Sequence, residues 1–250
     1  MRKFFVNSRN IKGKNIEIIG SDVNHIKNVL RLKKNDKVEI CNQETFENYI
    51  CEIYDINNEL VILNIIQKEP KIVEEKDIEL DIFQGLPKSD KMELIIQKGT
   101  ELGVNKFIPV AFNRCVVKLS GKDEIKKIER WQKIAKMASE QSHRYNVPKI
   151  DNIHNIKNIC NLVHEYDIIL VAYEEEKNNY IKNELINLKE LKQKLKIGVI
   201  VGPEGGFEKE EINILKDAGC KIVSLGKRIL RTETAPIMIS SVIMYEFENE

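Results

Sequence analysis

The stretch "IGVIVGPEGGFEKEEI" at residues 197–212 contains a strand, a tight turn and the start of a helix. A run of β-branched residues breaks at Gly202, and the turn at residues 202–206 carries three glycines around Pro203 and Glu204. Glycine lets a backbone adopt unusual dihedral angles and approach a ligand closely. The stretch therefore predicts a buried strand that leads through a ligand-binding turn into a helix.

The same alternation of strand and helix extends over the chain from residue 78 onward. Strands are expected at residues 78–83, 106–112, 168–173, 197–201 and 221–226. Helices are expected at residues 86–104, 123–144, 179–195 and 209–219, with a last one from about Thr234. Asp90 and Glu93 have the spacing of a capping box for the first of these helices. This pattern predicts an α/β domain with a largely parallel sheet, in which ligands bind at the carboxyl ends of the strands.

The first seventy residues have a different pattern, with short β-branched or aromatic segments at residues 37–41, 49–56 and 59–67. A short helix is expected at residues 21–31, capped by Ser21 or Asp22. Several strands with one short helix predict a small β-barrel. A linker is expected around residues 69–77, so that the domains comprise residues 1–72 and 73–250.

The charge of the chain is unevenly distributed, although its net value is only +1. Residues 1–37 hold ten Lys and Arg against three Asp and Glu, and residues 113–149 hold ten against four. Two basic regions favour a polyanionic partner, although ordinary solvated surface is the alternative. The five cysteines are widely spaced and lack a C-x-x-C pair, which indicates reduced thiols and a cytoplasmic protein. No apolar run is long enough to span a membrane, and no metal-binding motif occurs.

The glycine turn does not match a known phosphate-binding loop. A Walker loop needs G-x-x-x-x-G-K-[ST], but Phe207 and Glu208 follow the glycines here, and the G-x-G-x-x-G fingerprint is absent too. Glu204 and the glutamates after the turn would repel a pyrophosphate. The loop therefore favours a ligand with little negative charge, although a purely structural turn with Glu204 near a helix dipole fits equally well.

A second candidate loop, "SLGKRILRTETAP" at residues 224–236, follows the last expected strand. Lys227, Arg228 and Arg231 follow Gly226, and Pro236 lies in the first turn of the closing helix. Cations beside a turn for a neutral ligand suggest neighbouring sites for a cofactor and an anionic polymer. The alternative is that the arginines pair with surface carboxylates.

Together these loops resemble the cofactor-binding signature of the SPOUT methyltransferases, most closely the RsmE family, which methylates uracil at N3 in small-subunit (16S) ribosomal RNA. "MRKFFV", "HIKNVLRLKKNDKVEI", "LPKSDKMELIIQKGTELGV", "NRCVVK" and "ASEQSHRYNVPKI" extend the resemblance along the chain. The resemblance implies a PUA-like amino-terminal barrel, a carboxy-terminal domain tied in a trefoil knot, a homodimer, and S-adenosylmethionine as cofactor. It implies cofactor contacts from the following residues: Leu170, Ala172, Gly202, Pro203, Glu204, Gly205, Leu225, Gly226, Ile229 and Leu230.

The reaction that the resemblance implies needs a proton acceptor or a cation that stabilises negative charge on the uracil ring. Arg231 is the candidate for the electrostatic role. Glu101 is a candidate proton acceptor, but an ion pair with a lysine in the last helical turn is the favoured interpretation. Candidate RNA-binding residues are Arg2, Lys3, Arg9, Arg31, Arg114, Arg144 and Arg228. Two alternatives stay open: a SPOUT enzyme that methylates transfer RNA at a ribose 2′-hydroxyl or a base, and a non-catalytic RNA-binding protein.

Overall fold

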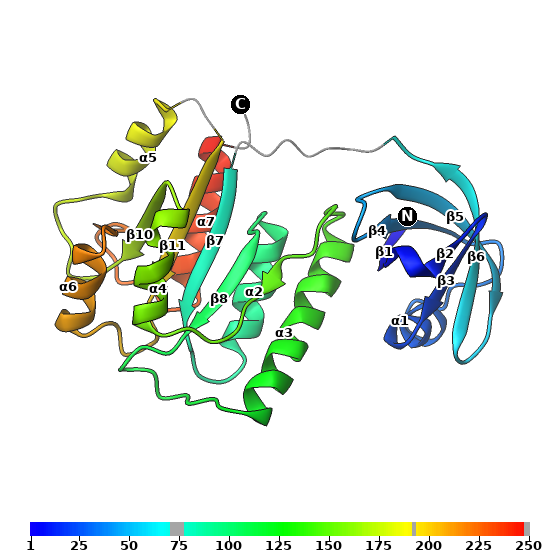
Figure 1. The fold of residues 1–250 in the computed structure, drawn as a ribbon, viewed down its shortest axis with the longest axis horizontal. Helices are drawn as coiled ribbons and strands as arrows, with labels where there is room; N and C mark the ends of the chain where they lie inside the picture. Colours follow the sequence, from blue (N-terminus) through cyan, green and yellow to red (C-terminus); the bar gives the residue numbers. More distant parts are fainter. Residues whose placement is uncertain (71–77, 192–193, 248–250) are drawn as a thin grey trace. The chain divides into compact units, whose positions relative to one another are not determined.

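The computed structural model describes residues 1–70, 78–191 and 194–247. The chain forms two compact units, one of Met1–Glu75 with Ser139–Val147 and the other of Lys76–Ala138 with Pro148–Glu250 (Figure 1). The boundary expected between residues 72 and 73 lies outside the described residues. The sequence did not predict that the 139–147 segment belongs to the first unit.

The first unit is a curled six-stranded sheet. Its strands are β1 (Arg2–Val6), β2 (Ile11–Lys12), β3 (Asn15–Ile19), β4 (Lys37–Asn42), β5 (Asn48–Ile56) and β6 (Leu60–Lys68), in the order β1-β4-β5-β6-β3-β2. Only β1 and β4 pair in parallel, and the other neighbours are antiparallel. Alternate side chains point inward, and Phe4, Ile40, Ile53 and Leu63 are fully buried in its core.

One short helical segment covers this sheet, as the sequence predicts, but its start differs. Helix α1 (Ser21–Asn24) continues as a π-helical turn through Val29. The residue that caps it is Gly20, at φ 76°, and no side chain makes a capping hydrogen bond. The expected cap by Ser21 or Asp22 is therefore wrong, because both residues already lie inside the first helical turn.

The second unit confirms the predicted α/β class with a parallel sheet. Its strands are β7 (Ile78–Gly85), β8 (Lys106–Val110), β9 (Lys149–Ile150), β10 (Ile168–Ala172), β11 (Leu195–Val201) and β12 (Lys221–Val223). The order is β12-β10-β11-β7-β8-β9, and every pair is parallel. The helices are α2 (Lys91–Glu101), α3 (Lys122–Gln141), α4 (Ile156–Leu162), α5 (Ile181–Lys189), α6 (Lys209–Asp217) and α7 (Thr234–Phe247).

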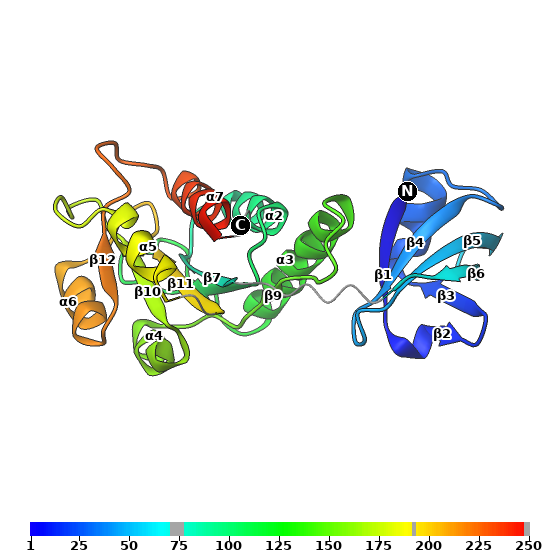
Figure 2. The ribbon, with the colours of Figure 1, turned by 90° about the horizontal axis from the view of Figure 1, so that it is seen from above.

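Helices lie on both faces of this sheet, with α2 and α7 on one side and α4 and α6 on the other (Figures 1 and 2). The central strands are therefore buried on both faces and read as continuous apolar runs. In β11, Ile197, Val199 and Ile200 are fully buried, and in β7 Leu80 and Ile82 are as well. This burial explains why the run at residues 197–201 is β-branched without alternation.

The expected capping box at the start of α2 does not form. Asp90 precedes the helix, but its side chain makes no capping hydrogen bond. Glu93 pairs instead with Arg130 of α3, whose Nε lies 2.8 Å from Glu93 Oε1. The ion pair between Glu93 and Arg130 of α3 thus forms in place of the capping box expected at the start of α2. Among the described residues, no helix has the length and apolar character needed to cross a membrane.

The 139–147 segment begins in the last turn of α3 and belongs to the first unit. Lys3 of β1 contacts this segment. The Lys3 ammonium lies 3.0 Å from Glu39 Oε1 and 4.0 Å from the centre of the Tyr145 ring. It also donates to the backbone oxygen of His143 at 3.4 Å. Lys3 is only 2% exposed, and this burial of its ammonium group argues against the predicted contact with RNA phosphates. It anchors the 139–147 segment instead.

Candidate functional site

A cavity of about 450 Å³ opens in the second unit at the carboxyl ends of β10, β11 and β12. Three segments line it: residues 172–174 at the end of β10, residues 201–204 with 206 and 207 at the end of β11, and residues 224–232 after β12. Lys91 at the start of α2 and Ala235 of α7 complete the lining. Both loops that the sequence singled out therefore meet at one site, as the rule for parallel sheets predicts.

The GPEGG turn at residues 202–206 is packed too tightly for side chains at several positions. A Cβ atom at Gly85, at the end of β7, would lie 2.6 Å from Pro203. Gly206 has φ 67°, and a Cβ there would lie 2.6 Å from Glu174 Oε1. Glycine at these positions allows the turn to approach both the end of β7 and the segment after β10.

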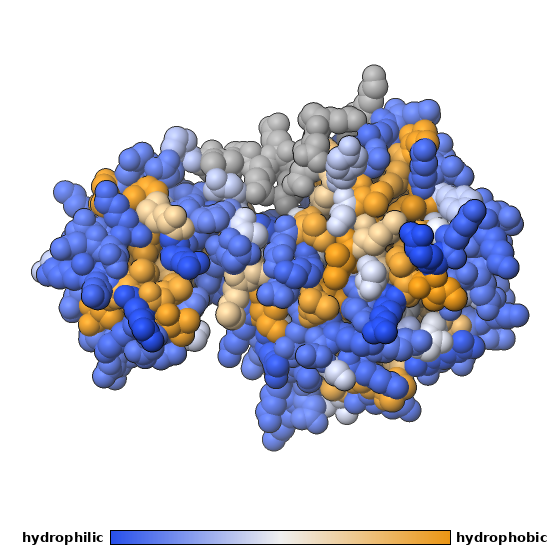
Figure 3. Space-filling model, turned by 180° about the vertical axis from the view of Figure 1, so that it is seen from behind, coloured by the Kyte–Doolittle hydropathy of each residue, from blue (hydrophilic) through white to orange (hydrophobic). Residues whose placement is uncertain are grey.

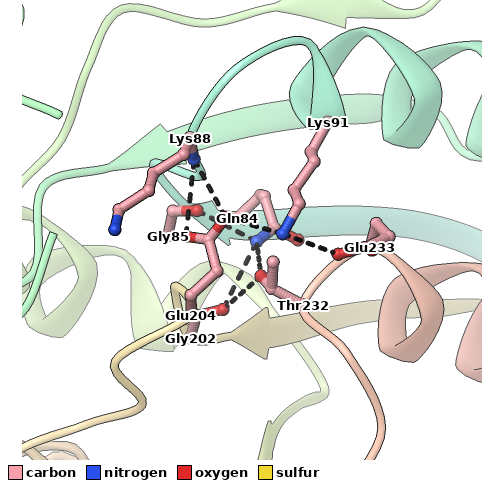
Figure 4. Close-up of polar contacts among 8 residues, drawn as sticks. All are labelled: Gln84, Gly85, Lys88, Lys91, Gly202, Glu204, Thr232 and Glu233. Atoms are coloured by element: carbon pink, nitrogen blue, oxygen red, sulfur yellow. Dashed lines mark hydrogen bonds and ion pairs between the residues drawn. The ribbon is translucent and has the colours of Figure 1, made fainter. Parts of the chain in front are cut away.

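A buried hydrogen-bond network holds the backbone of the turn (Figure 4). Thr232 Oγ1 donates to the carbonyl oxygen of Gly202 at 2.6 Å, and Gln84 Nε2 donates to Thr232 Oγ1 at 3.0 Å. Gln84 Nε2 also donates to the carbonyl oxygen of Gly85 at 2.9 Å. Gln84 is fully buried and Thr232 nearly so. The network therefore ties the two loops that line the cavity to the end of β7.

Glu204 is bound by the start of α2 and does not face the cavity as a free carboxylate. Lys91 Nζ lies 2.9 Å from Glu204 Oε1, and the Lys88 amide donates to the same oxygen at 3.1 Å (Figure 4). Lys91 also lies 3.3 Å from Glu233 Oε2, next to α7. Lys91 thus bridges the turn after β11 and the start of α7.

These contacts shift the ionisation of both partners. Partial burial alone would raise the pKa of Glu204, but the hydrogen bonds from Lys91 and from backbone amides outweigh it and lower that pKa. The hydrogen bond to Glu204 raises the pKa of Lys91, with a further contribution from Glu233. Both groups are therefore charged at neutral pH, and the predicted repulsion between Glu204 and a ligand is largely cancelled by Lys91.

Two further glutamates after the turn, Glu208 and Glu211, have structural partners. Glu211 accepts hydrogen bonds from the amides of Glu208 and Asn113, at 2.9 and 2.8 Å. Asn113 Nδ2 donates to Glu208 Oε2 at 2.7 Å. Glu208 and Glu211 therefore fix the amino-terminal end of α6 against the segment after β8. The sequence argument that they repel an anionic ligand does not describe their main role.

The loop after β12 offers its backbone to a ligand. Gly226 has φ 121°, which only glycine adopts without strain. In the described part of the chain, the amides of Leu225 and residues 227–230 donate no hydrogen bond to another group. Ile229 is 83% exposed. Exposed, uncommitted amides beside a cavity are well suited to recognise a flat polar ring.

The structure brings most of the expected cofactor-site residues together. Those that line the cavity are Ala172, Gly202, Pro203, Glu204, Leu225, Gly226, Ile229 and Leu230. Leu170 and Gly205 do not line it, because Leu170 is fully buried inside the sheet and Gly205 lies against Arg114. Arg228 and Arg231, expected for RNA binding and electrostatic catalysis, also line the cavity. Neither guanidinium has an ion pair with any residue that the structure describes.

Glu101 is not part of this site. It lies at the end of α2 and forms an ion pair of 2.9 Å with Lys98, three residues earlier. Sequence reasoning named this pair as the favoured alternative. Glu101 does not line the cavity, so the structure does not support a role for it as proton acceptor.

Sequence reasoning missed several residues that line the cavity: Lys91, Tyr173, Glu174, Gly206, Phe207 and Thr232. Tyr173 and Glu174 follow β10 directly, so the rule on strand ends contains the signal for them. Lys91 lies 113 residues before Glu204, and no local pattern predicts their contact.

The candidate RNA-binding residues have different environments. Arg2, Arg9 and Arg31 are exposed on the first unit. Arg144 is 8% exposed and donates to Asn146 Oδ1 at 3.0 Å. Arg114 is exposed and donates to the Gly205 carbonyl oxygen at 3.1 Å, next to the glycine turn. No cluster of three or more metal-binding side chains occurs among the residues described.

Known proteins resemble this chain over nearly its full length. Residues 74–244 match the RNA methyltransferase domain family, and residues 18–66 match the RNA methyltransferase PUA domain family. The ribosomal RNA small subunit methyltransferase E of Bacillus subtilis is 40% identical, over 92% of this chain and 90% of that protein.

Solved structures agree with these matches. A Legionella pneumophila methyltransferase with bound S-adenosylmethionine is 26% identical, with a TM-score of 0.85 over 97% of this chain and 96% of that one. The small subunit methyltransferase E of Neisseria gonorrhoeae, also bound to S-adenosylmethionine, is 25% identical, with a TM-score of 0.82 over 98% and 97%. The chain therefore belongs to the RNA methyltransferase family of the ribosomal RNA small subunit methyltransferase E proteins.

Proposed function

We propose that this protein transfers a methyl group from S-adenosylmethionine to the N3 atom of a uridine in small-subunit ribosomal RNA. One observation carries the proposal: the GPEGG turn and the loop after β12 form a single cavity with Arg228 and Arg231 at its wall. The relatives that match over the whole chain are named as small-subunit ribosomal RNA methyltransferases, and two solved relatives hold S-adenosylmethionine.

The residues of the cavity fit S-adenosylmethionine. The volume of about 450 Å³ suits a ligand of this size. Apolar side chains of Ala172, Leu225 and Leu230 suit the adenine ring, and the uncommitted amides of residues 227–230 suit its polar edge. Bound there, the cofactor supplies an electrophilic methyl group.

Arg231 is proposed to stabilise the uracil as it loses its N3 proton. That proton is lost about two to three pH units above neutrality, so reaching the anion costs roughly 3 to 4 kcal/mol. A guanidinium can bind a ring oxygen and a phosphate together. The Arg231 guanidinium has no ion-pair partner among the described residues, and its backbone oxygen accepts from the amides of Thr234 and Ala235 at 2.9 and 3.0 Å. The start of α7 therefore fixes its position while its side chain stays available.

The RNA is proposed to contact the basic residues of both units. Arg2, Arg9 and Arg31 are exposed on the PUA unit, and contacts of this kind to phosphates position a substrate without reading its sequence. The target uridine must present its N3 edge, so it must be unpaired or flipped out. We place this reaction on the assembled subunit in the cytoplasm, which agrees with the five free cysteines.

A homodimer is proposed as the working form. Helix α7 is apolar on nearly all sides, and its less buried side carries Ile237, Met238, Val242 and Tyr245. Tyr245 is 72% exposed. Hydrophobic surface gathers on the face of the second unit that carries α2 and α7 (Figure 3). A helix with apolar residues all round is normally covered, and a second copy of the chain would cover it.

Nucleoside mass spectrometry of ribosomal RNA from a strain without the gene tests this proposal. We expect 3-methyluridine to disappear from the small subunit and to return when the purified protein and S-adenosylmethionine are added to the isolated subunits. Loss of a ribose methylation or of a transfer RNA modification instead would favour another RNA methyltransferase activity. An unchanged nucleoside profile, with no S-adenosylmethionine binding in calorimetry, would favour a non-catalytic RNA-binding protein.

The Arg231→Ala variant tests the assigned role within that function. Its turnover should fall at least tenfold while its affinity for S-adenosylmethionine changes little, because Arg231 is assigned to the uracil. Full turnover with normal binding of both ligands would refute the role.

A further inference from the structure

The residues that line the cavity carry more positive than negative charges. Four cations line it, namely Lys91, Lys227, Arg228 and Arg231. Two carboxylates line it, Glu174 and Glu204, and Glu204 is bound by Lys91. Among the residues that the structure describes, Glu174 is therefore the lining carboxylate without an ion pair, in a cavity that three unpaired cations also line. A site of this composition would repel a cationic ligand if Glu174 were neutral.

The position of Glu174 is built into the backbone around it. The amide of Tyr173 donates to the Val223 carbonyl oxygen at 3.0 Å, which fixes the chain just after β10. The carboxylate of Glu174 lies against Gly206, where a Cβ atom would be 2.6 Å from Oε1. Gly206 has φ 67°, which favours glycine at this position. The turn thus leaves room for this carboxylate at the cavity wall.

Glu174 is distinct from the two glutamates that follow it. Glu176 accepts hydrogen bonds from the amides of Asn178 and Asn179, at 2.7 and 3.1 Å, and so stabilises its own turn. Glu175 is exposed, does not line the cavity and is hydrogen-bonded with the side chain of Tyr173. Within the described part of the chain, no cation lies within ion-pair distance of Glu174. Its charge has no internal structural partner.

We propose that Glu174 is a cofactor-binding residue that supplies the negative charge facing the cationic sulfonium of S-adenosylmethionine. This inference rests on the proposed function, since it needs S-adenosylmethionine as the ligand. The carboxylate gives the site a preference for the charged methyl donor over the neutral thioether product. After methyl transfer the sulfonium charge is gone, so the same carboxylate no longer holds the product and favours its release.

Calorimetric titration with two probes, S-adenosylmethionine and S-adenosylhomocysteine, tests the inference without measuring activity. The variant is Glu174→Gln, which keeps the shape and removes the charge. The matched control is Glu210→Gln, because Glu210 is exposed and does not line the cavity. We expect Glu174→Gln to weaken binding of S-adenosylmethionine about tenfold at low salt and to change binding of S-adenosylhomocysteine less than threefold. Glu210→Gln should leave both affinities within twofold of the unsubstituted protein.

Equal weakening of both ligands by Glu174→Gln would overturn the inference, because the charge of the sulfonium would then play no part. Unchanged affinities would overturn it as well. Melting curves of both variants should match the unsubstituted protein, since Glu174 is exposed and unpaired. If the unsubstituted protein binds neither probe, the proposed function itself fails. If the unsubstituted protein binds both probes and Glu174→Gln binds each probe with the same affinity as the unsubstituted protein, only the role of Glu174 fails.

Discussion

Replacing Thr232 by valine removes the hydroxyl group that joins the two loops lining the cavity. In the structure this hydroxyl donates to the Gly202 carbonyl oxygen at 2.6 Å and accepts from Gln84 Nε2 at 3.0 Å. Valine has nearly the same shape, so the change deletes hydrogen bonds without opening a large cavity. The Gly202 oxygen then keeps only the 3.5 Å contact from Gln84 Nε2, which is at the limit of a hydrogen bond.

The magnitude follows from the burial of the groups involved. Leaving a buried donor or acceptor without its partner costs about 1 to 3 kcal/mol. Two partners lose a bond here, and Gln84 retains the Gly85 oxygen at 2.9 Å, so we expect a loss of about 2 to 4 kcal/mol. For a unit of this size, each kcal/mol lowers Tm by about 2 to 4 °C. The second unit should therefore melt roughly 5 to 15 °C lower.

Differential scanning calorimetry and titration with S-adenosylmethionine measure the two consequences. In the valine variant, ligand binding must supply the free energy that restores the position of the turn. If this costs about 1 to 2 kcal/mol, affinity should fall about 5- to 30-fold. Thr232→Ser keeps the hydroxyl and serves as the control, which should retain most of the stability and affinity. A valine variant whose Tm and affinity both equal those of the serine variant would refute the assigned role of this hydrogen bond.

Three further predictions concern charged groups. Lys91→Met should weaken S-adenosylmethionine binding several-fold more than Lys91→Arg, because only arginine still bridges Glu204; equal affinities in calorimetry would contradict this. Lys3→Met should lower the free energy of unfolding, measured by urea titration, by about 3 kcal/mol, because the Lys3 ammonium in its ion pair is buried. Lys12→Met removes an exposed ion pair and should change the same free energy by less than about 1 kcal/mol. Burial raises the pKa of Asp81, so its carboxyl group binds a proton more tightly in the folded than in the unfolded protein. The free energy of unfolding should therefore fall as pH rises from about 4 through that raised pKa. Asp81→Asn should lack this loss in urea unfolding at pH 4 and pH 7, and an identical pH dependence would count against it.

The sequence predicted the architecture of the second unit because its signals are local and periodic. The apolar run at residues 197–201, the glycine turn after it and the amphipathic pattern of α3 each need only neighbouring residues. The rule that ligands bind at the ends of parallel strands then placed both loops at one site, and the structure agrees. The trefoil knot, which the resemblance alone implied, stays a prediction.

Polar partners were predicted less well, because they depend on residues that are distant in the sequence. Glu93 has the spacing of a capping box, but Arg130 on another helix binds it. Lys3 belongs to a basic cluster, but Glu39 and the 139–147 segment bury it. Charge clusters in a sequence give no information on which members the fold will pair and desolvate.

By itself the sequence determined the alternation of strands and helices, the two glycine-containing loops and the family, since each is written in contiguous residues. Only the tertiary structure decided that Lys91 pairs with Glu204 and that Glu174 lines the cavity without an ion-pair partner among the described residues. The physical reason is that a side chain's electrostatic role depends on what lies within about 4 Å of it. Those neighbours are assembled by the packing of the sheet and α2 from segments more than a hundred residues apart.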